Sequence, residues 1–403
     1  MSEWGRVQIG DLLAEPLRNG VSYPSKLRGS GIPMVNMGEA FAFDVIKDQK
    51  CELVPLTERE QERFLLEEGD LLFVRQSLVY SGAGRCVLVG SGTGPRTWES
   101  HLIRARLDKR AADPRFLYYY FRSPQGRSNM ETIVTQVAAA GIRGSDLKKL
   151  EIPHPSLSQQ QGISNVLWAL DGKIALNDHI ATISEQLLQF KFSELELSNE
   201  PDDRGIAITE LVEFNPKRTK PMNEEPVYVD MAALQTSRAG IPKWTLRSPK
   251  SGSRFMNGDT LLARITPCLE NGKTGYVNFM EDGEVGLGST EFIVMRSRPG
   301  VPSELSYFLA RDSRFREHAT RNMVGTSGRQ RVSAADAANY FVNRPDPDAL
   351  ATFGREAAAA FTHMKSAQGE NRALTALRDV LLPQLMSGRL RVKDAEKIVE
   401  DHV

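Results

Sequence analysis

The chain has 403 residues, with 51 basic and 51 acidic side chains and a formal net charge of zero. Hydrophobic residues make up 40% of the sequence and charged residues 25%, as in ordinary globular proteins. This length predicts two to three domains. The zero net charge argues against a protein that binds nucleic acid through overall basic charge alone.

Three further features restrict the class of protein. No run of 18 consecutive apolar residues occurs, so we expect no membrane span. The first residues, Met1 to Arg6, do not resemble a signal peptide, and we therefore expect a cytoplasmic protein. Three cysteines far apart predict neither a metal site nor a disulfide framework; they are Cys51, Cys86 and Cys268.

Residues 1–155 predict one globular domain of mixed α/β type, and residues 201–346 predict a second. Each opens with a segment typical of a strand or short helix, continues with apolar strands and then with an aromatic helix that packs on the sheet. A polar linker that contains Pro201 precedes the second domain at 198–204. The predicted segments are 7–13, 70–74, 82–89, 102–107 and 116–121 in the first domain, and 206–212, 260–265, 275–279, 292–296 and 304–310 in the second.

A long helix is predicted over residues 156–200. Ser156 is a suitable N-cap, Pro201 is a suitable stop, and no proline occurs between them. Its apolar residues form two successive stripes at helical spacing, about a third of a turn apart, so we expect different partners along its length. The stripes are Ile163, Leu167, Leu170 and Ile174, then Leu176, Ile180, Ile183, Leu187 and Phe190.

A second long helix is predicted over residues 347–390, followed by a C-terminal tail at 391–403. Because neither helix is stable alone in water, the two predict an antiparallel coiled coil. Two unrelated core helices are the alternative. The apolar positions of the second helix are Leu350, Phe353, Ala357, Phe361, Met364, Leu374, Leu377, Leu381 and Leu385.

Motifs of the first half return in the same order 188 to 190 positions later. A near-constant offset of this size indicates domain duplication and not a solenoid of short repeats. The predicted fold is therefore α+β, with two duplicated globular α/β domains separated by two long antiparallel coiled-coil helices. The matches include Asp70 with Asp259, His101 with Glu291, Pro114 with Pro302, and Asp146 with Asp336.

The sequence predicts no catalytic centre. Gly272-Lys273-Thr274 approaches a phosphate-binding loop, but Pro267 stands where the first glycine is needed. Asn215-Pro216-Lys217 fails the motif of amino-methyltransferases that act on bases. The histidines show no metal-ligand spacing. We therefore expect no cofactor and no metal on this chain.

Polar and basic loops are more informative. Arg, Gln, Ser and Thr on loops are the side chains that reach base edges and phosphates in DNA. A solvated surface is the alternative for any single residue. The candidate DNA-binding residues are Arg75, Gln76, Ser77, Arg143, Arg264, Thr266, Lys273, Thr326, Ser327, Arg329, Gln330 and Arg331.

Five segments carry a resemblance to a known family: residues 69–75, 145–153, 159–163, 171–174 and, most specifically, residues 377–390, Leu-Arg-Asp-Val-Leu-Leu-Pro-Gln-Leu-Met-Ser-Gly-Arg-Leu. With these segments the chain resembles the DNA specificity subunit of type I restriction–modification systems. The resemblance covers nearly the whole chain, because a duplicated domain followed by a long helix is the plan of that family.

The resemblance implies a non-catalytic DNA-binding subunit for DNA methylation and phage defence. Each globular domain would be a target-recognition domain that reads half of a split site in double-stranded DNA, and the helices would hold a fixed gap. Two methyltransferase subunits would dock on the helices, and restriction subunits would join the complex. S-adenosylmethionine, ATP and magnesium would bind those partners. The expected docking residues are Ile180, Ile183, Leu187, Phe190, Leu374, Leu377, Leu381 and Leu385.

The second copy departs from the family pattern. Residues 337–343 lack the form seen at 147–153, and the helix start at 346–350 lacks the glutamine run at 159–161. Both differences put one docking surface in doubt. Two other classes of function stay open, a single-chain enzyme with unrecognised catalytic residues and a coiled-coil scaffold that binds only protein.

Overall fold

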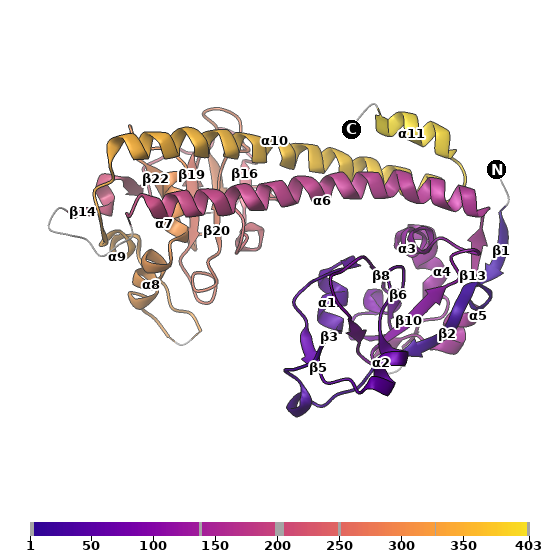
Figure 1. Ribbon diagram of the computed structural model, residues 1–403. Coiled ribbons are helices and arrows are strands. Elements are labelled where there is room, and N and C mark those ends of the chain that lie inside the picture. Colours follow the sequence, from indigo (N-terminus) through magenta and orange to yellow (C-terminus); the bar gives the residue numbers. More distant parts are fainter. Residues whose placement is uncertain (1–3, 137–138, 198–204, 249–250, 327, 401–403) are drawn as a thin grey trace. The chain divides into compact units, whose positions relative to one another are not determined.

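The computed structural model describes residues 4–136, 139–197, 205–248, 251–326 and 328–400 (Figure 1). The chain divides into two compact units. Unit 1 comprises Met1–Gly172 and Leu374–Val403, and unit 2 comprises Lys173–Ala373. Both long helices cross this boundary, so each unit contains an α/β part and a section of each helix.

Unit 1 is built on a five-stranded sheet in the order β2-β10-β6-β8-β4. Its pairs are antiparallel except β4 with β8, which is parallel. Strands β6 and β8 are buried along their whole length, as the apolar runs predict. The strands are β2 (Leu13–Asn19), β4 (Val45–Ile46), β6 (Leu71–Val74), β8 (Cys86–Val89) and β10 (Leu102–Leu107).

Smaller sheets and short helices complete unit 1. One sheet has the order β5-β3-β9, a second has the order β11-β12-β7, and β1 pairs with β13. The strands are β1 (Gly5–Gln8), β3 (Ile32–Val35), β5 (Glu52–Val54), β7 (Gln76–Ser77), β9 (Thr97–Trp98), β11 (Thr135–Gln136), β12 (Ala140–Gly141) and β13 (Glu151–His154). The helices are η1 (Ile9–Leu12), η2 (Ser25–Leu27), α1 (Met37–Ala42), α2 (Glu58–Phe64), η3 (Tyr80–Gly82), α3 (Pro114–Arg122), α4 (Pro124–Glu131) and α5 (Gly144–Lys149).

Unit 2 contains two four-stranded sheets, β15-β22-β19-β20 and β17-β16-β21-β18, and the pair β14-β23. The strands are β14 (Ile206–Ala207), β15 (Val212–Phe214), β16 (Val227–Val229), β17 (Thr245–Leu246), β18 (Ser253–Phe255), β19 (Asp259–Ala263), β20 (Thr274–Tyr276), β21 (Gly286–Gly288), β22 (Phe292–Ser297) and β23 (Phe341–Val342). The helices are η4 (Ile208–Glu210), η5 (Met231–Ala233), α7 (Leu305–Arg311), α8 (Ser313–Arg321) and α9 (Ala334–Ala338).

The aromatic helix of each copy forms as predicted. Asp113 caps α3, because its carboxylate accepts the amide hydrogen of Arg115 at 2.9 Å, and Pro114 occupies the first turn. Residues 116–121 of α3 and residues 305–310 of α7 are buried without interruption. These helices therefore pack on the sheets of their own units.

The repeated Gly-Asp pair has a structural role in both units. Gly69 and Gly258 have φ values of 97° and 85°, a region that favours glycine. Asp70 accepts the amide hydrogen of Glu67 at 2.8 Å, and Asp259 accepts that of Met256 at 2.8 Å. Both aspartates are buried, and each closes the turn that precedes its strand.

Each buried aspartate is also paired with arginine. Asp70 binds Arg106 through two hydrogen bonds of 2.8 Å. Asp259 binds Arg296 at 2.7 Å and Arg218 at 2.8 Å. Arg106 and Arg296 lie at corresponding positions of the two copies, so the ion pair itself is duplicated.

Helices α6 (Leu157–Glu194) and α10 (Pro347–Met386) are the two long helices predicted from the sequence. They run antiparallel in both units. In unit 2, Asn177 lies 2.9 Å from Asn371 and Lys191 pairs with Glu356 at 2.5 Å. In unit 1, Asp171 pairs with Arg378 at 2.7 Å.

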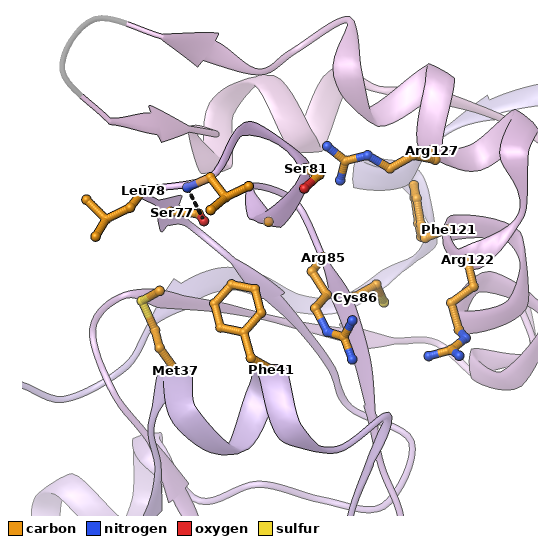
Figure 2. A pocket seen from close by; sticks show the side chains of 12 residues that line it. Met37, Phe41, Ser77, Leu78, Ser81, Arg85, Cys86, Phe121, Arg122 and Arg127 are labelled. Carbon is orange, nitrogen blue, oxygen red and sulfur yellow. Dashed lines mark hydrogen bonds between the residues drawn. The ribbon is translucent and has the colours of Figure 1, made fainter. Parts of the chain in front are cut away.

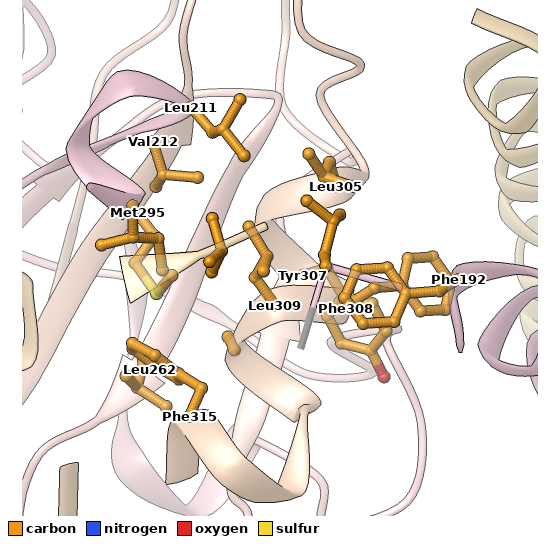
Figure 3. Close-up of a cluster of buried hydrophobic side chains, with 14 of the residues drawn as sticks. Phe192, Leu211, Val212, Leu262, Met295, Leu305, Tyr307, Phe308, Leu309 and Phe315 are labelled. Carbon is orange, nitrogen blue, oxygen red and sulfur yellow. The ribbon is translucent and has the colours of Figure 1, made fainter. Parts of the chain in front are cut away.

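Aromatic side chains attach the helices to the α/β part of unit 2 (Figure 3). Phe192 of α6 stacks on Phe308 of α7 with ring centroids 5.9 Å apart. Phe353 and Phe361 of α10 contact the same Phe308 ring edge-on, at 5.4 and 6.0 Å. One core therefore contains side chains of α6, α7 and α10.

The C-terminal segment differs from the expected tail. Residues Val392–Glu400 form helix α11, with Ala395 and Val399 buried. A side chain at Gly162 of α6 would place its Cβ only 3.0 Å from Val392, so this glycine allows the close approach of α11. The predicted linker at 198–204 lies outside the described residues. No helix that the structure describes is long and apolar enough to cross a membrane.

Candidate nucleic-acid interface

Two loops meet beside the end of strand β6 in unit 1. The segment after β6 forms β7, which pairs with β12, and β12 pairs in turn with β11. The amide of Arg75 donates to the carbonyl of His101 at 2.8 Å, and the amide of Ile142 donates to the carbonyl of Arg75 at 2.9 Å. These bonds bring Arg75 and Gln76 together with the loop that precedes Arg143.

Unit 2 repeats the same arrangement after strand β19. The amide of Arg264 donates to the carbonyl of Glu291 at 3.0 Å, and the amide of Val332 donates to the carbonyl of Arg264 at 3.1 Å. Thr266 also donates its amide hydrogen to Gln330 at 3.1 Å. Loop 324–331 thus lies against residues 264–266, and we call each such arrangement a loop pair.

The predicted residues of the unit 1 loop pair differ in accessibility. Gln76 and Arg143 are exposed, and Arg75 is half-buried with its guanidinium 3.3 Å from the carbonyl of Ser100. Ser77 is buried, and its hydroxyl accepts the amide hydrogen of Val79 at 3.1 Å. The prediction that Ser77 contacts DNA is therefore wrong; Ser77 shapes the loop that follows it.

Arg329 and Thr326 are exposed in the unit 2 loop pair, and Gln330 is half-buried. Among the described residues, no side chain pairs with the guanidinium of Arg329. Arg264 and Thr266 are half-buried. Ser327 lies outside the described residues.

Two predicted basic residues of unit 2 already have partners. Arg331 binds Glu291 in a bidentate ion pair with distances of 2.7 to 2.9 Å. The hydrogen bonds from Arg331 hold the pKa of Glu291 below its ordinary value, so the pair is ionised at neutral pH. Lys273 donates to the carbonyl of Met231 at 3.0 Å and is half-buried. Both side chains are engaged within the unit. Among the described residues of the predicted set in unit 2, Arg329 is the exposed cation, and Arg264 is half-buried.

A cavity of about 750 Å³ lies beside the unit 1 loop pair (Figure 2). Met37 and Phe41 of α1 face it from one side, and Leu78 projects outward from the loop. Arg85, Arg122 and Arg127 line it as well. The sequence analysis missed this cavity, although the run Leu78-Val79-Tyr80 directly after a polar strand end was a visible signal.

The arginines of the cavity are held in place by carboxylates. Arg85 binds Asp44 at 2.7 Å, Arg122 binds the same carboxylate, and Arg127 binds Glu131 at 3.0 Å. Burial raises the pKa of Asp44, but the hydrogen bond from Arg122 and the charges of both arginines outweigh burial, so the pKa lies below its ordinary value.

The predicted docking residues fall into two groups. Ile180, Ile183, Leu187 and Phe190 form one stripe on the unit 2 section of α6, together with Leu176, which was not among the predicted docking residues; the exposed fractions of these five side chains lie between 37% and 62%. On α10, by contrast, Leu374, Leu381 and Leu385 are buried in unit 1 and Leu377 is half-buried. Leu374, Leu381 and Leu385 belong to the core of unit 1 and present no free docking surface, whereas docking at the half-buried Leu377 stays a prediction.

The described residues contain no group of three or more His, Cys, Asp or Glu side chains that could hold a metal ion. The fold defines a duplicated protein. Each α/β unit displays a polar loop pair and contains a section of the antiparallel helices α6 and α10. Such a protein is suited to bind a ligand at two separate places, one for each loop pair.

Comparison with known proteins finds one family in common. Residues 1–185 match the family described as the type I restriction modification DNA specificity domain. Residues 1–185 are thus similar to that family, and the resemblance to specificity subunits is confirmed.

Curated relatives include the type I restriction enzyme EcoAI and EcoKI specificity subunits of Escherichia coli. The chain is 27% identical to the former over 57% of its own length and 39% of the relative's, and 30% identical to the latter over 40% and 35%. The chain thus spans less than half of the length of these relatives. The MjaIX specificity subunit of Methanocaldococcus jannaschii is 23% identical over 69% of each chain.

A solved structure shares the fold. The crystal structure of the S subunit of a type I restriction–modification system from M. genitalium superposes with a TM-score of 0.59 at 16% identity. The match covers 95% of this chain and 96% of that one. The predicted fold class, duplicated α/β domains with two long helices, is therefore confirmed.

Proposed function

We propose that this chain is the DNA specificity subunit of a type I restriction–modification complex and reads a split target, one half-site per unit. The observation that carries this proposal is the duplicated loop pair. Both units fix their loops with the same backbone hydrogen bonds, yet the side chains displayed differ, Gln76 and Arg143 in one and Thr326 and Arg329 in the other. Two loop pairs with the same backbone structure but different exposed side chains are suited to bind two half-sites of different sequence.

The exposed side chains of the loop pairs match DNA recognition. Gln and Arg can form paired hydrogen bonds with the major-groove edges of adenine and guanine, and Arg also binds phosphates. The chain itself is uncharged overall. Binding therefore depends on local basic loops and on partner subunits that help to enclose the duplex.

Arg329→Ala is expected to weaken binding at one half-site and leave the preference at the other intact. If Arg329 contacts phosphate, the slope of log K against log salt should fall by about one, because one fewer counterion is released. Fluorescence anisotropy of the reconstituted complex at several salt concentrations measures this slope. Arg321→Ala, which removes an exposed arginine of α8 outside the loop pair, serves as the control. Equal binding by Arg329→Ala and wild type would remove Arg329 from the interface.

The same titration tests the proposed function itself. A DNA-reading complex should lose affinity steeply as salt rises, because Lys and Arg side chains displace counterions from the phosphates. A scaffold that binds only protein would show no salt-dependent DNA binding at all.

The exposed stripe of α6 is the proposed docking surface for methyltransferase subunits. Its five large apolar side chains lie on one exposed face of the helix, and burial of this face by a partner is favourable because water solvates apolar groups poorly. In this proposal the chain is non-catalytic. S-adenosylmethionine, ATP and magnesium act on the methyltransferase and restriction subunits.

Ile183→Lys is expected to abolish stable association with the methyltransferase, because it places a charge in the middle of the stripe. Ile183 is 50% exposed, so the substitution should leave the melting temperature of the isolated chain nearly unchanged. Co-purification of the two proteins is the measurement. Gln186→Lys adds the same charge on an exposed position outside the stripe and should co-purify normally. Normal recovery of methyltransferase with Ile183→Lys would mean that docking occurs elsewhere.

A further inference from the structure

The loop after strand β7 has an unusual surface. Leu78 is 95% exposed, Val79 is 64% exposed and Tyr80 is 40% exposed. Phe41 of α1, across the adjoining cavity, is 41% exposed. Exposed apolar clusters of this kind mark surfaces that another molecule covers.

The loop is nevertheless firmly held. Ser77 accepts the amide hydrogen of Val79 at 3.1 Å, and the amide of Gly82 donates to the carbonyl of Val79 at 2.9 Å. Arg127 donates to the carbonyls of Ala83 and Tyr80 at 2.7 and 3.3 Å. A side chain at Gly82 would place its Cβ 2.4 Å from the Ser77 hydroxyl, so the loop closes tightly at its base. These contacts preorganise the apolar tip in an outward position, which lowers the entropic cost of binding.

The corresponding loop of unit 2 differs at these positions. Counted from the matched Arg75 and Arg264, the exposed Pro267 stands in place of Leu78, and the buried Leu269 stands in place of Tyr80. An exposed leucine at the tip is therefore not a requirement of the duplicated fold. It is specific to the surface that unit 1 presents.

The position of the tip within the loop pair favours DNA over an apolar protein partner. Leu78 lies two residues after the exposed Gln76, and Ser77 between them pairs with Ala140 in the loop pair. The three arginines that line the adjoining cavity are each paired with a carboxylate, Arg85 and Arg122 with Asp44 and Arg127 with Glu131, so the loop pair itself supplies the contacts to DNA. A duplex read by Gln76 and Arg143 would meet Leu78 in the same groove.

We infer that Leu78 reads thymine in the half-site of unit 1 by packing against the C5-methyl group in the major groove. This methyl group is the apolar feature that a base edge offers there, and apolar side chains recognise it by contact. The inference rests on the proposed function, because it assumes that unit 1 binds DNA through its loop pair.

The test uses the full chain in complex with its methyltransferase subunits. The probes are duplexes that carry the split motif found by methylation mapping, with each thymine replaced in turn by deoxyuridine, which lacks only the methyl group. Loss of one buried methyl corresponds to about a fourfold weaker Kd. Wild type should show this loss at a thymine of one half-site. Leu78→Ala should bind the unmodified duplex about fourfold or more weakly and show no further loss at that thymine.

Leu27→Ala is the matched control, because Leu27 is an exposed leucine of unit 1 outside the loop pair. It should keep the wild-type pattern of deoxyuridine sensitivity. Since Leu78 is almost fully exposed, Leu78→Ala should melt at the wild-type temperature, which separates loss of contact from loss of fold.

Two results would overturn the inference. One is that no thymine of either half-site is sensitive to deoxyuridine in wild type. The other is that Leu78→Ala retains the wild-type sensitivity, whether its overall affinity falls or its assembly with methyltransferase weakens. A wild-type complex that shows no split motif would instead contradict the proposed function, so the two failures are distinguishable.

Discussion

Replacing Asp259 by alanine is expected to destabilise unit 2 by about 3 to 5 kcal/mol. The carboxylate is fully buried and binds Arg296, Arg218 and the amide of Met256. Alanine would leave the half-buried guanidinium of Arg218 without its counter-charge, and it would release the turn before β19. Burial raises the pKa of Asp259, and the hydrogen bond from Arg296 and the charge of Arg218 act in the opposite direction by favouring the carboxylate.

Hydrogen–deuterium exchange measures this effect unit by unit. Asp259→Ala should accelerate exchange in β19 and β22 while the sheet of unit 1 keeps its protection. Glu281→Ala, at an exposed acidic residue of the same unit, should leave exchange unchanged. If Asp259→Ala lowered the free energy of unfolding of unit 2 by less than about 1 kcal/mol, the duplicated ion pair would not be a main contribution to the stability of the unit.

Inserting one heptad into both long helices is expected to lengthen the gap between the two half-sites. Seven residues add about 10 Å of helix and change its phase by only about 20°. At 3.4 Å per base pair, this corresponds to about three base pairs. The boundary between the units, after Gly172 in α6 and before Leu374 in α10, is the place for the insertions. Insertions at this boundary leave both contacts between the helices intact. The ion pair of Asp171 with Arg378 lies within unit 1, and the contact of Asn177 with Asn371 lies within unit 2.

The half-site sequences should not change, because the loop pairs are untouched. A heptad in α6 alone should instead disturb the antiparallel pairing and reduce specific methylation. Mapping of methylated sites reads out both variants. The same gap in the double-insertion variant and in wild type would rule out the helices as a spacer.

Apolar periodicity and repeated motifs predict most of the fold features that could be obtained from the sequence. The two long helices follow from apolar periodicity and from the absence of interior proline in the first of them. The duplication follows from a constant offset between motifs such as the Gly-Asp pair. Helix α11 was missed because its short amphipathic segment depends on Gly162 and the start of α6, far away in the chain.

The structure brings the predicted loops together, but it holds several of their side chains in contacts that the sequence did not reveal. The sequence identified the two segments that form each loop pair, since both carry Arg, Gln, Ser or Thr. It did not reveal that Arg331 is bound to Glu291, 40 positions away, or that the Ser77 hydroxyl turns inward. On α10, apolar spacing identified a face but could not distinguish core leucines from a docking surface, because both need the same periodicity.

The most direct test of the central claim is methylome sequencing of a host that expresses the neighbouring methyltransferase, with and without this chain. We predict a split motif with a fixed gap that is methylated only when the chain is present. A contiguous motif, or methylation that does not depend on the chain, would contradict the proposal that this protein supplies DNA specificity.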